Sequence, residues 1–289
     1  MKIGFWGAGT MGSGIGRNLL RSGHELVVYS RELSRAESIA RVGRGAATTE
    51  RSDLAQCEVL FTCLARPQHA EEGLLGEKGL YALMKPGSVH IECSTIGPDL
   101  AVRLAAAAKE RGMGYVQATL GKTPAMAEKA EEPIFAGGEP EVLERIWPLL
   151  EQVGKPENVG SVHASCAVKL ISNLVGMTNI AVLGEGLRIG RAAGMDMHQL
   201  LRLLGDTGAH SFQMDARGAS ICDREYSPAR FALTLALKDV GLGTDMAKEW
   251  NVSVPLFDKA CELYAAGVEQ GLSEEDCAAV AEVSEIRQS

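Results

Sequence analysis

The sequence predicts an α/β protein in which a doubly wound, mainly parallel Rossmann-like sheet is followed by an all-helical C-terminal domain. Short apolar runs alternate with helical stretches over about the first 160 residues, a rhythm typical of parallel sheets. After Gly160 the strand signals stop, and the remaining sequence is typical of helices. The expected domains are 1–162, which contains the sheet, and 163–289, which is helical.

Six segments have the length and composition of strands: 2–6, 26–29, 59–64, 89–92, 115–118 and 134–136. Beyond them, residues from about 164 to 193 predict an apolar helix, which at 1.5 Å per residue would span about 45 Å. We expect this helix to be buried between the domains or within a dimer. Later breaks are expected at Gly194, at Gly205, near Pro228 and at Pro255.

Composition excludes several functions. The net charge of −8 and the pI near 5.4 argue against nonspecific binding to nucleic acid or to an anionic membrane. We expect no apolar run to approach the roughly 20 residues of a membrane helix, and the N-terminus shows no cleavable signal pattern, so a cytoplasmic protein is expected. The seven cysteines form no C-x-x-C pair and no cluster at metal spacing, which predicts neither a disulfide framework nor a metal site.

The N-terminus carries a dinucleotide fingerprint, because strand 2–6 is followed directly by G-x-G-x-x-G and a helix. Gly7 would form the tight turn, Gly9 would let the backbone approach the pyrophosphate, and Gly12 would allow close packing of helix and strand. Thr10 and Met11, between these glycines, are also expected to contact the cofactor. The alternative is a glycine-rich turn without a ligand.

The end of the second strand favours NADP over NAD. NAD enzymes usually carry an acidic residue there, whereas this chain has Ser30 and Arg31, with Arg35 one helical turn later. A serine and arginines suit the 2′-phosphate of NADP. The alternative is that Arg31 is an ordinary solvated arginine.

The long helix carries a candidate general acid/base. Lys169 and Asn173 are four residues apart and therefore share one face, which Gly176 continues. Burial disfavours the charged form of a lysine and lowers its pKa, which is the property that proton transfer near neutral pH requires. On the residue pattern alone, an ion-paired or snorkelling lysine remains the alternative.

Over essentially its whole length the chain resembles the β-hydroxyacid dehydrogenase family, which includes 3-hydroxyisobutyrate dehydrogenases, semialdehyde, glyoxylate and sulfolactaldehyde reductases and, more distantly, 6-phosphogluconate dehydrogenase. The resemblance rests on the fingerprint with Asn18-Leu19-Leu20-x-x-Gly23-His24 after it, on Glu92-Cys93-Ser94-Thr95, on the K-x-x-x-N of Lys169 and Asn173, and on F-x-x-x-L-x-x-K-D at Phe231, Leu235, Lys238 and Asp239.

The resemblance implies a hydride transfer between NADP and a small anionic 3-hydroxy acid or its aldehyde acid, in a homodimer or homotetramer. Lys169 would donate the proton to the aldehyde oxygen or accept it from the alcohol, and Asn173 would orient the substrate. Leu64, Thr95 and Lys238 are expected at the cofactor, with Ser94 and Phe231 lining the substrate pocket. We expect domain 1–162 to bind NADP, domain 163–289 to contribute to substrate binding and dimerisation, and the active site to lie in the cleft between them.

Two segments depart from the family pattern. The family's substrate loop usually reads D-A-P-V-S-G-G, but here Gln117-Ala-Thr-Leu is followed by Gly121, Lys122 and Thr123. This loop is similar to the G-R-T-S loop of sulfolactaldehyde reductases, which makes Lys122 and the backbone of 121–123 a candidate anion clamp; the alternative is a lysine that points to solvent. His163 and Ser165 also replace glycines that the family favours, which weakens assignment of a substrate by analogy.

Two rival functions remain open at this stage. Imine reductases share the architecture but generally have an aspartate or tyrosine at the position of Lys169, and a noncatalytic nucleotide-binding protein could use the same fold. A third motif, the Y-x-x-x-K of Tyr81 and Lys85, is typical of short-chain dehydrogenases but occurs too early in the chain, and we interpret it as a coincidence.

Overall fold

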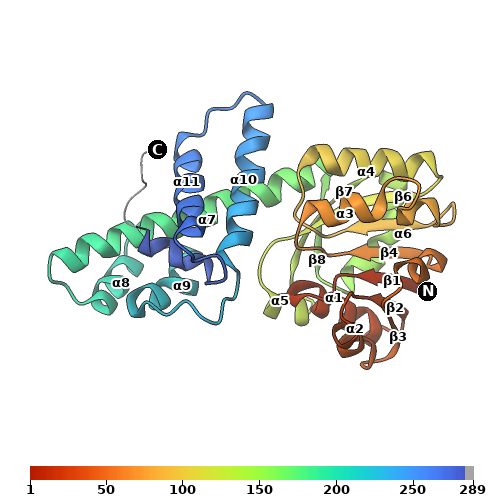
Figure 1. Cartoon of the computed structure of the whole chain (residues 1–289), viewed down its shortest axis with the longest axis horizontal. Helices are drawn as coiled ribbons and strands as arrows, with labels where there is room; N and C mark the ends of the chain where they lie inside the picture. The colour runs from red at the N-terminus through yellow and green to blue at the C-terminus, as the bar shows by residue number, and fades with distance from the viewer. Residues whose placement is uncertain (284–289) are drawn as a thin grey trace. The chain divides into compact units, whose positions relative to one another are not determined.

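The computed structural model describes residues 1–283 and divides the chain into two compact units, Met1–Lys169 and Leu170–Ser289 (Figure 1). The first unit is built on one eight-stranded sheet with helices on both faces, and the second is helical. The predicted fold class is therefore confirmed.

The sheet has the strand order β3-β2-β1-β4-β5-β6-β7-β8, and every neighbouring pair is parallel except the antiparallel pair β6 and β7. Its strands are β1 (Lys2–Trp6), β2 (Glu25–Tyr29), β3 (Arg44–Thr48), β4 (Val59–Thr62), β5 (Val89–Glu92), β6 (Gly114–Leu120), β7 (Pro133–Gly138) and β8 (Lys155–Gly160).

Two of these strands, β3 and β8, were not predicted. They form the two edges of the sheet, and no residue of either is buried. An edge strand has no second neighbour and needs no apolar run to cover it, so its sequence lacks the hydrophobic signal of a central strand. Pro156 within β8 is also typical of an edge, because proline cannot donate to a further strand.

Two apolar clusters cover the two faces of the sheet. One cluster packs Ile15 and Leu19 of α1, with α2 and α6, against strand residues such as Phe5. The other packs η1, α3, η2 and α4 against the opposite face, where Leu60 and Tyr115 are buried. The helical segments of this unit are α1 (Thr10–Arg21), α2 (Leu33–Ala40), η1 (Arg51–Gln56), α3 (Pro67–Leu74), η2 (Leu80–Ala82), α4 (Pro98–Glu110), α5 (Pro124–Glu128) and α6 (Pro140–Glu151).

The second unit forms a separate apolar core that includes Leu174, Ile180 and Tyr264. Helices end close to where glycine and proline predicted, since α8 ends at Gly205 and α11 begins at Pro255. The helical segments are α7 (Val162–Ala192), which begins in the first unit, α8 (Met197–Gly205), α9 (Phe212–Asp223), α10 (Leu233–Glu249), α11 (Pro255–Glu269) and η3 (Cys277–Glu282).

Helix α7 corrects one expectation from the sequence. Within residues 1–283 it is the one helix long and apolar enough to cross a membrane by length and composition, so an apolar stretch of that size does exist. Its inward residues Leu174, Met177 and Ile180 are at most 5% exposed and belong to the helical core. Burial therefore accounts for one face of α7, whereas Val182 and Ile189 on another face are 60% and 72% exposed.

Candidate active site

The three fingerprint glycines meet three different surroundings. Gly7 has φ +143°, and a Cβ there would lie 2.3 Å from the carbonyl oxygen of Cys63. A Cβ on Gly12 would lie 2.0 Å from the carbonyl oxygen of Gly7, whereas one on Gly9 would meet nothing within 4 Å. Gly7 and Gly12 are therefore required by the protein's own packing. Gly9 leaves open space, as a site that receives a ligand must.

The space beside Gly9 faces the start of α1. Gly9 is the N-cap of this helix, no side chain caps the helix, and its first turn contains no acidic residue. The first backbone N–H groups of a helix have no partner inside it and carry partial positive charge, so an uncapped N-terminus attracts phosphate. These residues fit the pyrophosphate of a dinucleotide. Thr10 is exposed and Met11 partly buried at the same end.

The end of β2 places the predicted selectivity residues on the surface. Arg31 and Arg35 are both exposed. The hydroxyl of Ser30 accepts a hydrogen bond from the N–H of Glu32 at 3.2 Å, and the Arg35 guanidinium pairs with the Glu32 carboxylate at 2.8 Å. One of the two arginines thus has a carboxylate partner within the protein.

Three hydrogen bonds hold Ser94 at the carboxyl end of β5. Its N–H donates to Glu92 Oε1 at 2.7 Å, its hydroxyl oxygen accepts from the N–H of Leu64 at 2.7 Å, and its carbonyl accepts from Gln117 at 3.2 Å. Ser94 is 2% exposed, so it supports the loop, while Thr95 beside it is partly exposed. Residues of β5, of β6 and of the segment after β4 thereby hold Ser94, which was predicted to line the substrate pocket.

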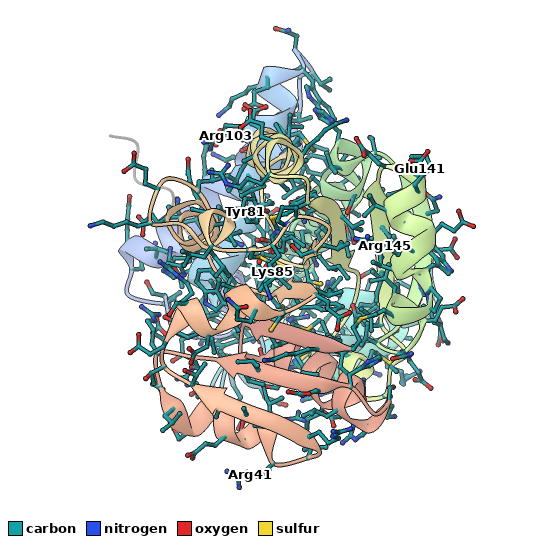
Figure 2. The ribbon with its side chains drawn as sticks, turned by 90° about the vertical axis from the view of Figure 1, so that its right-hand side faces the viewer. Arg41, Tyr81, Lys85, Arg103, Glu141 and Arg145 are labelled. Carbon is teal, nitrogen blue, oxygen red and sulfur yellow. The ribbon has the colours of Figure 1, made fainter. Side chains whose placement is uncertain are left out.

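A buried chain of polar groups continues from this loop into the sheet. His90 contacts the Thr62 hydroxyl at 2.7 Å through Nε2 and the Tyr81 hydroxyl at 2.6 Å through Nδ1. Burial lowers the pKa of His90 to about 3 and raises the pKa of Glu92 to about 7. Tyr81 is thus a core residue on η2, and Lys85 is exposed (Figure 2), which supports the interpretation of Y-x-x-x-K as a coincidence.

The predicted anion clamp has a carboxylate of the protein on its backbone. The N–H of Lys122 donates to Glu132 Oε1, and the N–H of Gly121 donates to the carbonyl of Pro133 at 2.9 Å. Glu132 is fully buried, whereas the Lys122 side chain is exposed and Thr123 partly buried. The backbone donors of Gly121 and Lys122 are therefore engaged internally, and the side chains of Lys122 and Thr123 are the groups this loop presents.

The segment before Lys169 is tied to the sheet by Ser165. Its hydroxyl donates to the carbonyl of Phe135 at 2.6 Å, and its own carbonyl accepts from the Thr119 hydroxyl at 3.0 Å. Ser165 is buried, while His163 is exposed. The serine that replaces a family glycine thus fastens the start of α7 to β6 and β7. Lys169 follows it by four residues and is partly buried.

In the helical unit, one buried carboxylate joins two of the predicted residues. Asn173 Nδ2 on α7 donates to Asp239 Oδ2 at 2.6 Å, and Lys238 Nζ on α10 pairs with Asp239 Oδ1 at 2.7 Å. Asp239 is 3% exposed. Asp239 stands in the F-x-x-x-L-x-x-K-D motif, but no role was predicted for it. Its contact with Asn173 joins two helices, and no spacing within either helix indicates it.

Phe231 is held in place by a second buried carboxylate. Its N–H donates to Asp276 Oδ2 at 3.1 Å, and Arg217 pairs with Asp276 Oδ1 at 3.0 Å. Burial alone would raise the pKa of Asp276, but the Arg217 charge and backbone N–H groups keep it below the ordinary value. The Phe231 ring is partly buried against the helical core.

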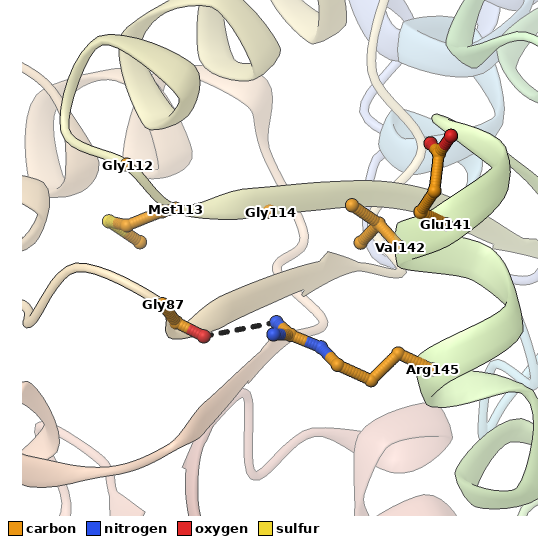
Figure 3. A pocket seen from close by; sticks show the side chains of 7 residues that line it. All are labelled: Gly87, Gly112, Met113, Gly114, Glu141, Val142 and Arg145. Carbon is orange, nitrogen blue, oxygen red and sulfur yellow. Dashed lines mark hydrogen bonds between the residues drawn. The ribbon is translucent and has the colours of Figure 1, made fainter.

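A surface pocket of about 410 Å³ lies away from these residues (Figure 3). Gly87 and Gly114 place it at the amino ends of β5 and β6, and Arg145 crosses it to donate to the Gly87 carbonyl at 3.0 Å. Ligands of open α/β sheets bind at the carboxyl ends of the strands, so this pocket is not the expected site. Within residues 1–283 no group of His, Cys, Asp or Glu is arranged to hold a metal.

Comparison with known proteins agrees with this geometry. The sequence profile described as the NAD binding domain of 6-phosphogluconate dehydrogenase matches residues 2–170. The profile described as NAD-binding of NADP-dependent 3-hydroxyisobutyrate dehydrogenase matches residues 164–284. Together the two profiles cover nearly the whole chain.

Two individual relatives match this chain over nearly their whole length. The 2-(hydroxymethyl)glutarate dehydrogenase of Eubacterium barkeri is 32% identical, over 99% of this chain and 95% of the relative. The chain belongs to the β-hydroxyacid dehydrogenase family. The NAD-dependent L-serine dehydrogenase of Pseudomonas aeruginosa is 29% identical to this β-hydroxyacid dehydrogenase, over 96% of each chain.

Solved structures agree with this family membership. The 3-hydroxyisobutyrate dehydrogenase of Salmonella typhimurium superimposes on the β-hydroxyacid dehydrogenase with a TM-score of 0.88 at 25% identity, covering 98% of this chain and 99% of the other. An imine reductase from Myxococcus stipitatus reaches 0.65 at 16% identity, a likeness that shows the fold alone. The protein is thus an oxidoreductase of the hydroxyacid dehydrogenase and semialdehyde reductase type, with an NAD(P)-binding domain.

Proposed function

We propose that this β-hydroxyacid dehydrogenase uses NADPH to reduce a short aldehyde acid to the 3-hydroxy acid, with Lys169 as the general acid. The pair formed by Lys169 and Asn173, one helical turn apart on α7, is the observation that carries the proposal. When bound, the cofactor supplies the hydride from C4 of its nicotinamide. Lys169 donates the proton to the aldehyde oxygen, and in the reverse direction it accepts that proton from the alcohol.

The surroundings of Asn173 support a positioning role. Because its amide N–H₂ donates to Asp239, its orientation is fixed and the amide oxygen remains able to accept a hydrogen bond from the substrate. Lys238 pairs with the other oxygen of the same carboxylate. Asp239 therefore sets the position of both the substrate-orienting amide and the lysine assigned to the cofactor.

The preference for NADPH rests on the end of β2. An acidic residue is absent from position 30, and Arg31 is exposed there. The nearby Glu32 is paired with Arg35, which reduces its repulsion toward a 2′-phosphate. Reduction is the proposed direction because cells generally keep NADPH available for reductions.

An anionic substrate needs local attraction, because the net charge of −8 repels it. We assign this attraction to the exposed Lys122, with the Thr123 hydroxyl as a hydrogen-bonding neighbour. We also propose a homodimer or homotetramer, since α7 keeps a row of exposed apolar residues on one face, including Val182 and Ile189. The proposed location is the cytoplasm.

The experiment that tests the function is a panel of short semialdehydes and glyoxylate, each supplied to the purified protein with NADPH and with NADH. Consumption of NADPH with one of these substrates, at several times the rate seen with NADH, is the expected result. Preference for NADH would refute the cofactor assignment alone. Turnover confined to cyclic imines would instead favour the imine reductase alternative, and binding of NADPH without turnover of any compound would favour the noncatalytic one.

A further inference from the structure

Glu132 is a buried acid that the reaction as described above does not use. It lies directly before β7 and is 0% exposed. Its Oε1 accepts from the Lys122 N–H, while its Oε2 is buried and has no hydrogen-bond partner among the described residues. A buried carboxylate oxygen without a partner is costly, so its retention in a packed region calls for a physical reason.

The backbone aims this side chain at the substrate loop. The carbonyl of Glu132 accepts from the Lys155 N–H of β8 at 2.7 Å, and a Cβ on Gly154 would lie 2.4 Å from that carbonyl oxygen. The main chain of Glu132 is thus held on the β8 side. Its carboxyl faces the 121–123 loop on the other side, where Oε1 accepts from the Lys122 N–H.

The same carboxyl is influenced by Lys169. Burial raises the pKa of Glu132 above its ordinary value, and the Lys122 N–H, the charge of Lys169 and the N–H groups of Thr123 and Gly121 oppose that rise. Lys169 on α7 supplies this charge and the 121–123 loop supplies the N–H groups, whereas the Lys155 N–H of β8 donates to the main-chain carbonyl of Glu132. A charge interaction acts on both partners, so the Glu132 carboxylate attracts the Lys169 ammonium in turn.

We propose that Glu132 is a positioning residue of the reaction, whose carboxylate fixes the Gly121–Thr123 loop through its backbone and holds the ammonium of Lys169 by charge. The inference rests on the role proposed for Lys169. A carboxylate in this place keeps the proton donor charged until it is used, and it occupies the Lys122 N–H, which a substrate anion would otherwise take. Anion recognition is thereby left to the side chains of Lys122 and Thr123.

A matched pair of substitutions separates charge from packing. Glu132→Gln keeps the volume and an oxygen that can accept the Lys122 N–H, but it removes the charge. Glu131→Gln removes the same charge from the neighbouring exposed position. In the direction of reduction, kcat/KM falls at high pH as Lys169 loses its proton. This limb of the profile against pH should move to lower pH by about one unit in E132Q, because an opposite charge has been lost. The limb of E131Q should coincide with that of the native enzyme.

A profile of kcat/KM against pH for E132Q that superimposes on the native profile, in a protein with the native melting temperature, would overturn the proposal. A merely structural role would lower stability or kcat at every pH without moving the limb. The shift of the limb is therefore the readout that distinguishes positioning by charge from support of the fold.

A second measurement needs neither turnover nor a variant of Glu132. The amide resonance of Lys122 reports the ionisation of the carboxyl that accepts its N–H, so its pH titration can be followed by NMR in the native protein and in Lys169→Met. The midpoint should lie at higher pH in K169M, because the charge that favours the carboxylate is gone. Equal midpoints would refute the coupling. A shifted midpoint in a protein that reduces no semialdehyde would uphold the coupling while the proposed function fails.

Discussion

The direction in which the pKa of each buried carboxyl group shifts depends on the donors around it. Glu92 and Glu132 each face backbone N–H groups but no paired arginine, and burial raises the pKa of both. Asp276 has Arg217 as a partner, which outweighs burial and lowers its pKa. The first two lie beside loops assigned to cofactor and substrate, and the third fixes the backbone of Phe231. The same functional group therefore serves loop placement in one unit and helix anchoring in the other.

Glu92→Gln should change how stability depends on pH. Burial raises the pKa of Glu92 from 4.5 to about 7, so between these values the folded protein keeps a proton that the unfolded chain releases. Stability from this group is full below pH 4.5 and is lost as the pH rises to about 7, by about 3 kcal/mol. His90, whose pKa is lowered from 6.5 to about 3, has the opposite slope and masks the effect in the native protein.

The measurement is the free energy of unfolding in urea at pH 5 and at pH 8, for the native protein and for E92Q. The free energy of unfolding of E92Q minus that of the native protein should be about 2 to 3 kcal/mol larger at pH 8 than at pH 5. Taking the difference cancels the contribution of His90. A difference that stays constant with pH would show that Glu92 titrates near its ordinary value.

Gly9→Ala should weaken cofactor binding without destabilising the protein. Gly9 has φ −90°, which alanine adopts freely, and a Cβ there meets no protein atom within 4 Å. The added methyl would occupy the space proposed for the pyrophosphate, so we expect the Kd for NADPH to rise at least tenfold, or about 1.4 kcal/mol. Thermal unfolding with and without NADPH measures both effects.

The control for this test is Gly205→Ala, another glycine whose Cβ would meet nothing, at the end of α8. It should leave the Kd unchanged. Native affinity in G9A would mean that the dinucleotide does not approach the backbone at this turn.

Among the helices and strands, the sequence predicted those that are rich in apolar residues because they are buried. The central strands are apolar because both of their faces are covered, and α7 was predicted at about 164–193 against an observed Val162–Ala192. The edge strands β3 and β8 were missed because they are not buried. The glycine fingerprint could be assigned because its strand, turn and helix are contiguous in the chain.

Contacts between distant positions were beyond the sequence. The bond from Asn173 to Asp239 joins residues 66 positions apart, and the motif spacing on each helix gives no information about it. The contact between Lys122 and Glu132 spans ten positions across a turn and a short helix, where several loop conformations are compatible with the same residues. Residue types could be assigned to a site in advance, but which donors were already used inside the protein could not.

The exposed face of α7 makes a prediction about assembly. Ile171, Val175, Val182 and Ile189 lie on one face at spacings of four and seven, and Val182 is 60% exposed. Val182→Glu should convert the proposed dimer or tetramer to a smaller species, because it places a charge in an apolar interface. Light scattering after size-exclusion chromatography gives the mass. Val252→Glu, an exposed valine outside α7, is the control; a native protein that is already monomeric would contradict the proposed assembly.

At the scale of the whole molecule, the two units supply different parts of the proposed chemistry. The sheet unit provides the uncapped helix for the pyrophosphate, the supported loop at Ser94 and the proton donor Lys169. The helical unit provides Asn173, with Asp239 to orient it. Lys169 and Asn173 are four residues apart on α7, which is one helical turn. This spacing is the reason we assign them to one reaction.

The central claim is that Lys169 transfers the proton, and Lys169→Met tests it most directly. In the semialdehyde assay with NADPH, K169M should lose at least a thousandfold in kcat, of the order expected for general acid catalysis, while its Kd for NADPH, measured by fluorescence, stays within a factor of three of the native value. Lys129→Met, at an exposed position, should behave as the native enzyme. Native turnover in K169M would contradict the account, because another group would then have to supply the proton.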